Sequence, residues 1–241
     1  MSSFVLKAGL DPEALAEAFA RDGRLQIVDF LRHDGALALF RELVASKEWR
    51  LAVNRGEAVE DHGEAELAAW PAERRAAFDR AVEEAGRHAF QFRYDTIRLP
   101  EYGTGSGQVA PPLLSRFVDF LSSPELVDFM RTVTGSVEIA FADGHASRYR
   151  SGHFLTAHDD SQVDMGRRAA YVLNLTPQWR PDWGGILQFY DSRGNVERGF
   201  TPAFNVLNVF LVPQPHSVSW VTPLAGAPRY AVTGWLRAGK R

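Results

Sequence analysis

Two histidines and two adjacent aspartates lie in one short stretch, YRSGHFLTAHDD, at positions 149–160. In an extended strand the side chains alternate between the two faces, so His158 and Asp160 would point the same way, about 7 Å apart at their α-carbons. Asp159 would point the other way and meet solvent. An imidazole and a carboxylate at this spacing can converge on one metal ion. Because such pairs also occur by chance, a metal site needs a further ligand from elsewhere in the chain.

The candidate for that further ligand is His216, in the segment VFLVPQPHSVSWV. It follows an apolar run and a proline-bounded turn, and it begins the next predicted strand. Two histidines and one carboxylate that leave coordination positions open are typical of non-haem Fe(II) oxygenases. The same ligands suit Zn(II), so a metal-binding β-barrel without oxygenase activity, such as a hydrolase, an isomerase or a sensor, stays an alternative.

Arg229 lies in the segment APRYAVTGWLR, on a strand that should run beside the strand of His216. An arginine that points into an apolar barrel needs an anionic partner, and its planar guanidinium fits a carboxylate. Arg229 therefore predicts a dicarboxylate ligand that meets the metal at one end and the guanidinium at the other. A hydrolase has no need of such an anchor.

These residues, with Tyr149 before the first histidine, resemble the Fe(II)- and 2-oxoglutarate-dependent dioxygenases, in the SM-20-like prolyl-hydroxylase branch. The likeness covers roughly residues 137–237 and is closest to the group that hydroxylates a ribosomal protein in eukaryotes. It implies a double-stranded β-helix, the jelly roll of cupin-like proteins. It also implies that Fe(II) and 2-oxoglutarate are bound by two sets of residues: His158, Asp160 and His216 for the metal, and Tyr149 and Arg229 for the co-substrate.

The resemblance also implies the reaction. The enzyme would consume O2 and 2-oxoglutarate, hydroxylate a prolyl residue of a protein, and release succinate and CO2, with ascorbate as a candidate further cofactor. Related halogenases have a small residue in place of the carboxylate, so Asp160 favours hydroxylation. A small-molecule hydroxylase is the alternative within the family, because the substrate is selected by loops rather than by the fold.

Three further residues are candidates for the co-substrate pocket. Members of the ribosomal-protein group carry a second tyrosine where this chain has Asn174, whose amide could donate a hydrogen bond to the distal carboxylate. Thr233 and Trp235 share a face with Arg229 by strand alternation, so they would line the pocket or fill the barrel. His145 and His153 are expected at turns or on the surface.

The rest of the sequence predicts a helical first part and a β-rich second part. Apolar residues at helical spacing, with proline or glycine at the ends, predict helices within 10–23, 34–49, 71–92 and 111–135, and a short strand at 24–31. Residues 101–112 are predicted to be an open loop. From Val137 onward, short β-branched and aromatic runs predict about seven strands. We therefore expect a single α+β domain over 1–241, with a mostly helical support region (1–136) outside a mainly β core (137–241) that holds the metal site.

Composition limits the class of protein. The net charge is −3, which gives no strong field for nucleic acid or anionic lipid, so neither partner is expected and a nucleic-acid demethylase is the weaker branch. There is no cysteine, so metal ligands must be His, Asp, Glu or backbone groups. No apolar run is long enough to span a membrane and no signal peptide begins the chain, which predicts a cytoplasmic protein. The helices show no heptad seam, so the oligomeric state stays open.

Overall fold

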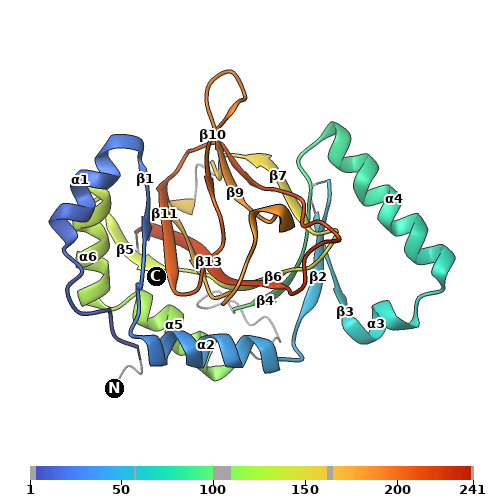
Figure 1. Ribbon diagram of the computed structural model, residues 1–241, viewed down its shortest axis with the longest axis horizontal. Helices are drawn as coiled ribbons and strands as arrows, with labels where there is room; N and C mark the ends of the chain where they lie inside the picture. Colours follow the sequence, from blue (N-terminus) through green and yellow to red (C-terminus); the bar gives the residue numbers. More distant parts are fainter. Residues whose placement is uncertain (1–3, 57, 100–109, 162–164, 240–241) are drawn as a thin grey trace.

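The computed structural model describes residues 4–56, 58–99, 110–161 and 165–239. Within them, 13 strands join in one antiparallel sheet that curls into a nearly closed barrel (Figure 1). The strands are β1 (Arg24–Ile27), β2 (Arg50–Arg55), β3 (Ala58–Gly63), β4 (Phe92–Arg98), β5 (Ile139–Ala142), β6 (His145–Tyr149), β7 (Phe154–His158), β8 (Arg167–Asn174), β9 (Leu187–Tyr190), β10 (Val196–Phe200), β11 (Val206–Leu211), β12 (His216–Val218) and β13 (Arg229–Ala238).

The strand order brings the second half of the chain around a common interior. Neighbouring strands follow the order β1-β11-β8-β13-β6-β4-β7-β12-β9-β10, while β2 and β3 extend from β4 and β5 pairs with β13. The two ends of this order are linked by an ion pair between Arg24 of β1 and Glu197 of β10. The guanidinium of Arg24 also lies 5.1 Å from the ring centre of Phe189 in β9. These contacts help to close the barrel where the backbone ladder is interrupted.

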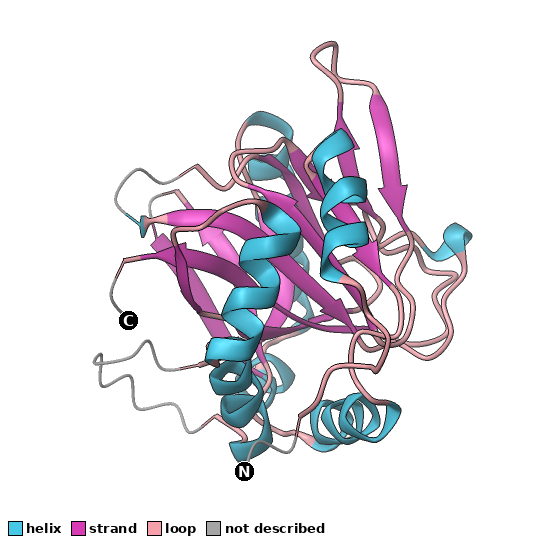
Figure 2. Cartoon of the chain, turned by 90° about the vertical axis from the view of Figure 1, so that its left-hand side faces the viewer, coloured by secondary structure: helices cyan, strands magenta, loops and turns pink. Residues whose placement is uncertain are grey.

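Helices cover the outside of the barrel. They are α1 (Pro12–Asp22), α2 (His33–Ala45), α3 (Glu64–Ala69), α4 (Ala72–His88), α5 (Pro112–Leu121) and α6 (Pro124–Thr134). The predicted end signals operate as expected: the Asp11 carboxylate accepts hydrogen bonds from the first turn of α1, and the helix ends at Gly23 with φ 64°. Figure 2 shows helices lying in front of the strands that they cover.

Strand β8 separates two apolar cores. Ala169, Tyr171 and Leu173 pack under the helices, in a core that includes side chains from α1, α2, α5 and α6. Ala170 and Val172, on the opposite face, line the inside of the barrel. Because both faces of β8 are covered, its sequence RRAAYVLN carries a continuous apolar run rather than an alternating one. Packing of the outer core therefore fixes the position of β8, whose other face lines the inside of the barrel.

A third, smaller core attaches α3 and α4 to the other side of the barrel. Leu51 and Val53 of β2 pack with Phe78 and Val82 of α4 and with Trp70. In Figure 1 these two helices lie on the right, away from α1 and α6. The pair of helices therefore supports the part of the sheet formed by β2, β3 and β4.

The predicted architecture, a mainly β barrel with helices outside, agrees with the structure. The first 136 residues are less helical than expected, because β2, β3 and β4 join the same sheet as β1. Strand β10 was also not predicted, since its sequence VERGF is polar and mostly exposed. Most of the predicted loop at 101–112 lies outside the described residues. Within the described part of the chain, no helix is both long and apolar enough to cross a membrane.

Gly234, in the middle of β13, gives a stability prediction. A Cβ at this position would lie 2.1 Å from the Asp143 carbonyl oxygen, so the Gly234→Ala variant must displace backbone. We expect a loss of about 1–3 kcal/mol in the free energy of unfolding, measured by urea denaturation. In the control Gly86→Ala, on α4, the nearest atom to the new Cβ is 3.5 Å away. That variant should be as stable as the wild type or slightly more so, and equal losses in the two would contradict the argument.

Candidate active site

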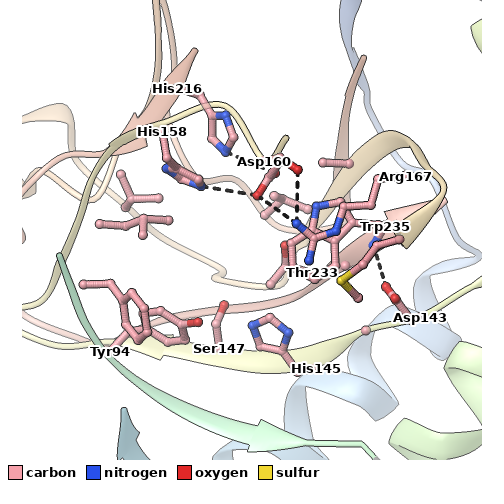
Figure 3. Close-up of a pocket in the computed structure, with 18 of the residues that line it drawn as sticks. Tyr94, Asp143, His145, Ser147, His158, Asp160, Arg167, His216, Thr233 and Trp235 are labelled. Atoms are coloured by element: carbon pink, nitrogen blue, oxygen red, sulfur yellow. Dashed lines mark hydrogen bonds and ion pairs between the residues drawn. The ribbon is translucent and has the colours of Figure 1, made fainter. Parts of the chain in front are cut away.

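A cavity of about 1020 Å³ occupies the inside of the barrel (Figure 3). Its apolar lining comes from the inward faces of several strands and includes Ala170, Val172, Leu187, Phe210 and Val218. The polar side chains in the lining include His158, Asp160, His216 and Arg229. A concave, mostly apolar site with a few converging polar groups is the usual form of a ligand site.

Three potential metal ligands meet at this cavity. His158 ends β7 and His216 begins β12, and the two residues are direct partners in the antiparallel ladder. Asp160 Oδ1 lies 3.5 Å from His158 Nε2, and its Oδ2 lies 3.5 Å from His216 Nε2. The ligand atoms of all three lie within 4.8 Å of one another, in the only such group among the described residues.

Asp160 reaches the histidines in a different way from the one predicted. Strand β7 ends at His158, so the alternation of strand side chains does not apply to Asp160. Its backbone is left-handed instead, with φ 62°. Aspartate tolerates this region better than most residues, and such conformations occur at functional sites where the surroundings hold them. Asp159 is exposed and its carboxylate accepts a hydrogen bond from the Ser161 N–H, which agrees with its predicted solvated position.

Backbone contacts orient both histidines toward the carboxylate. Nδ1 of His158 lies 3.0 Å from the Thr156 carbonyl oxygen, and Nδ1 of His216 lies 2.8 Å from that of Gln214. A carbonyl can only accept, so each Nδ1 carries the proton and each Nε2 keeps its lone pair. This is the arrangement by which metal-binding histidines are commonly held.

The charge states also suit a cation. Burial, and then the neighbouring His158, lower the pKa of His216 to about 4, so its ring is neutral at pH 7. Burial on its own raises the pKa of Asp160, but the adjacent His158 and His216 lower it overall, which keeps the carboxylate ionised. Arg167 donates a hydrogen bond to the Asp160 carbonyl oxygen and lies 3.9 Å from its carboxylate. The site therefore offers two imidazole nitrogens and one anionic oxygen.

Arg229 lies deeper in the barrel. Its side chain is 2% exposed, and its Nη2 donates to Oδ1 of Asn174 at 3.4 Å. Its Nε and Nη1 have no hydrogen-bond partner among the described residues, and no ion pair with a described carboxylate is present. Burial lowers the pKa of Arg229, while Tyr149, whose ring centre lies 5.2 Å from the guanidinium, opposes that effect. A buried cation with two open donors is costly unless an anion binds there.

The other predicted pocket residues differ in where they lie and in what they present. Tyr149, Thr233 and Trp235 line the cavity. The Thr233 hydroxyl donates to the Tyr171 carbonyl oxygen. The Arg167 guanidinium lies over the Trp235 ring, with its central carbon 3.5 Å from the ring centroid. Asn174 is fully buried outside the lining, with its amide nitrogen beside backbone carbonyl oxygens and its oxygen toward Arg229.

The expectation for His145 was wrong, because it is in β6 and lines the cavity. His153 does lie at a turn, where its N–H donates to the Arg150 carbonyl oxygen, but it is 3% exposed rather than at the surface. Sequence reasoning also missed Tyr94 of β4 and Ser147 of β6, which line the cavity too. The signal for β6 was available, because His145, Ser147 and Tyr149 alternate and must share one face. The contribution of β4 was hidden because the strand follows directly on a long amphipathic helix.

Comparison with known proteins agrees with this geometry. Residues 144–237 match the model of the 2OG-Fe(II) oxygenase superfamily. This part of the chain is thus similar in sequence to the 2OG-Fe(II) oxygenase domain. Prolyl 3-hydroxylase OGFOD1 of Mus musculus is 31% identical over 101 residues, or 39% of this chain, and that of Xenopus laevis is 30% identical over 131 residues, or 52%. These matches span 18% and 23% of the relatives' own lengths.

Solved structures show the same fold. A prolyl-4-hydroxylase of Pseudomonas putida has 22% identity and a TM-score of 0.60, with 95% of this chain and 100% of that chain covered. A prolyl hydroxylase of Trichoplax adhaerens, solved with a fragment of a hypoxia inducible factor, has 18% identity and a TM-score of 0.57, with 94% and 89% covered. The predicted double-stranded β-helix is therefore confirmed.

The superfamily that residues 144–237 match implies Fe(II), 2-oxoglutarate and O2, and the residues present in the cavity fit them. Two imidazole nitrogens and a carboxylate are a suitable ligand set for Fe(II). The open donors of Arg229 suit the distal carboxylate of 2-oxoglutarate. Both features lie in one cavity, which is what a co-substrate that spans them requires.

His153 gives a prediction for the pH dependence of stability. Burial lowers its pKa from 6.5 to about 3, so the unfolded chain takes up a proton below about pH 6.5 that the folded protein does not. Stability is therefore lost as the pH falls from about 6.5 to about 3. Between pH 6 and pH 5 we expect the free energy of unfolding to fall by about 1 kcal/mol less in His153→Leu than in the wild type. The measurement is urea denaturation at each pH.

The control is Val82→Ala, a buried position of α4 that carries no titratable group. It should be less stable than the wild type at every pH, with the same pH slope. Identical slopes for His153→Leu and the wild type would show that His153 is protonated in the folded state.

Proposed function

We propose that this protein is an Fe(II)- and 2-oxoglutarate-dependent dioxygenase that hydroxylates a prolyl residue of a protein substrate. The observation that carries the proposal is the pairing, in one cavity, of the three metal-ligand side chains with a buried arginine whose donors are open. A hydrolytic metal site would have no use for that arginine, because nothing in hydrolysis requires an anchored dicarboxylate.

Each residue has a defined role in this proposal. His158 and His216 present Nε2, and Asp160 presents an ionised oxygen, so together they hold Fe(II) and leave the cavity side open. Arg229 and Tyr149 bind the distal carboxylate of 2-oxoglutarate, with Asn174 holding one side of the guanidinium. When bound, the metal supplies the redox chemistry in which O2 and 2-oxoglutarate are consumed, the substrate is hydroxylated, and succinate and CO2 are released.

The apolar lining contributes by controlling water. Leu187, Phe210 and Val218 line the same cavity as Arg229 and the histidines, and each is 6% exposed or less. Ionic contacts in such a water-poor space are stronger than in solvent. The lining therefore favours a dicarboxylate that is neutralised at both ends over a ligand that carries charge along its middle.

The names of the relatives support a prolyl residue in a protein as the substrate. We further propose a single domain over 1–241, a cytoplasmic location, and ascorbate as a reductant that keeps the metal in the ferrous state. Thr233 and Trp235 complete the pocket in this proposal. A small-molecule substrate is the alternative outcome of a substrate screen.

The first test is an anaerobic titration of the metal-free protein with Fe(II) and then 2-oxoglutarate. We expect a visible metal-to-ligand charge-transfer band, because 2-oxoglutarate would chelate the iron. His158→Ala should abolish the band by removing a ligand. Arg229→Ala should keep the band but require at least tenfold more 2-oxoglutarate, since a charge-assisted contact is worth about 1.5–3 kcal/mol.

The control is Arg193→Ala, which removes an arginine whose side chain is 83% exposed and should change neither titration. If metal binds normally to the wild type and no band forms with 2-oxoglutarate, the role of Arg229 is wrong and the metal barrel without oxygenase activity becomes the better account.

Asn174 gives a second prediction for the same site. Its Oδ1 is the hydrogen-bond acceptor of Arg229 Nη2, so Asn174→Ala should leave the guanidinium less well oriented. We expect the 2-oxoglutarate concentration at half-saturation to rise about three- to tenfold, the effect of one lost hydrogen bond, while Fe(II) affinity stays at the wild-type value. A rise in both constants would instead indicate general disruption of the barrel.

A further inference from the structure

Three polar residues of the cavity have no role in binding the metal or the co-substrate. They are Tyr94 of β4 and His145 and Ser147 of β6, and we call them the polar wall. All three line the cavity, and Figure 3 shows them across it from His158, Asp160 and His216. The Tyr94 ring is stacked on the His145 ring, with centroids 6.1 Å apart and planes at 20°. The wall is thus a preformed surface facing the metal site.

The hydrogen-bonding capacity of the polar wall is unused. Within the described residues, no hydrogen bond is made by the hydroxyl groups of Tyr94 and Ser147 or by the ring nitrogens of His145. None of these atoms is both fully buried and without a hydrogen-bond partner, so each keeps some exposure. Because the residues that carry them line the cavity, the atoms face it. Polar atoms with open capacity inside a ligand cavity indicate a group that binds there.

The far end of the polar wall lies well away from Arg229. In the β6–β13 ladder Tyr149 pairs with Arg229, Ser147 with Ala231 and His145 with Thr233. Along the strand, Ser147 is about 7 Å and His145 about 13 Å from the level of Arg229. The Tyr94 ring lies between the rings of Tyr149 and His145, with centroids 5.2 and 6.1 Å away. A molecule as small as 2-oxoglutarate, held by Arg229 and the metal, leaves the part of the wall around His145 to a second molecule. In the proposed reaction that molecule is the substrate.

The polar wall is also uncharged. Burial, and then the nearby Arg98, lower the pKa of His145 to about 4, and burial raises the pKa of Tyr94 to about 12. The charged neighbours are paired with one another: Arg98 holds Asp61 in a double contact at 2.9 and 3.2 Å, Arg237 lies 3.0 Å from Asp143, and Arg167 lies 3.9 Å from Asp160. A charged substrate group would lose its hydration here without gaining a counter-charge.

We infer that the polar wall is a substrate subsite that donates hydrogen bonds to an uncharged peptide carbonyl next to the target prolyl ring. A prolyl peptide has no N–H, so its amide can only accept hydrogen bonds. Each residue of the wall can donate, through a hydroxyl or through the N–H of a neutral imidazole. This inference rests on the proposed function and deepens it by stating what the substrate must present beside the metal.

The test uses the full chain loaded with Zn(II), which cannot support turnover, and 2-oxoglutarate. The probe is N-acetyl-L-proline methylamide, and its dissociation constant is measured by ligand-observed NMR. We expect Tyr94→Phe, Ser147→Ala and His145→Phe each to weaken probe binding about three- to tenfold, the effect of one neutral hydrogen bond. His145→Gln, which keeps a donor, should recover most of the loss.

Two comparisons separate this inference from general damage. The affinity for 2-oxoglutarate, measured by calorimetry on the same samples, should stay within twofold of the wild type in all wall variants. The matched control His88→Phe, at an exposed position of α4, should leave both affinities unchanged. Free L-proline, which is a zwitterion, should bind far more weakly than the capped probe.

The outcomes distinguish failure of the substrate subsite from failure of the proposed function. If 2-oxoglutarate binds and the wall variants hold the probe as tightly as the wild type does, the subsite is wrong and the proposed cofactor chemistry stands. Tighter binding of L-proline than of the capped probe would also overturn the subsite. If 2-oxoglutarate does not bind to the wild type, the proposed function fails, and the subsite fails with it.

Discussion

The buried guanidinium of Arg229 is the constraint on which the rest of the cavity depends. A cation at 2% exposure with two open donors costs several kcal/mol unless an anion neutralises it. The barrel holds it by backbone rather than by counter-charge: β13 pairs with β6 from Arg229 to Thr233 and with β8 from Ala231 to Arg237. The fold thus keeps in place a charge that only a ligand can satisfy.

The same strand sets the spacing of the site. From Arg229 outward, β13 presents Thr233 and Trp235 to the cavity. Its antiparallel partner β6 presents Tyr149, Ser147 and His145, in that order from the Arg229 end. Because side chains alternate between the two faces of each strand, every second residue of both strands faces the cavity at a fixed spacing. Distances along the cavity are therefore determined by the register of one antiparallel pair. Gly234, between two of these residues, has no room for a side chain because the Asp143 carbonyl oxygen lies against it.

Sequence reasoning could predict the barrel, the three potential ligands and Arg229, because residue type and order along the chain carry those signals. It could not predict how Asp160 reaches the histidines, since its left-handed backbone depends on the turn after β7 rather than on strand alternation. It also placed His145 and His153 outside the interior. Their burial arises from pairing with β4 and from the packing of other strands, and such non-local contacts leave no periodic pattern in one sequence.

The two ends of the cavity differ in the way they select a ligand. At Arg229 the selection is by charge, because only an anion offsets the cost of the buried cation. At Tyr94, His145 and Ser147 it is by hydrogen-bond direction, because these groups are neutral and their charged neighbours are already paired. A dicarboxylate is poorly matched to the neutral end, and a peptide carbonyl is poorly matched to the charged end. In the proposed function, in which both molecules bind in the cavity that the potential metal ligands also line, this difference gives each of them one orientation relative to the metal, without any movement of the barrel.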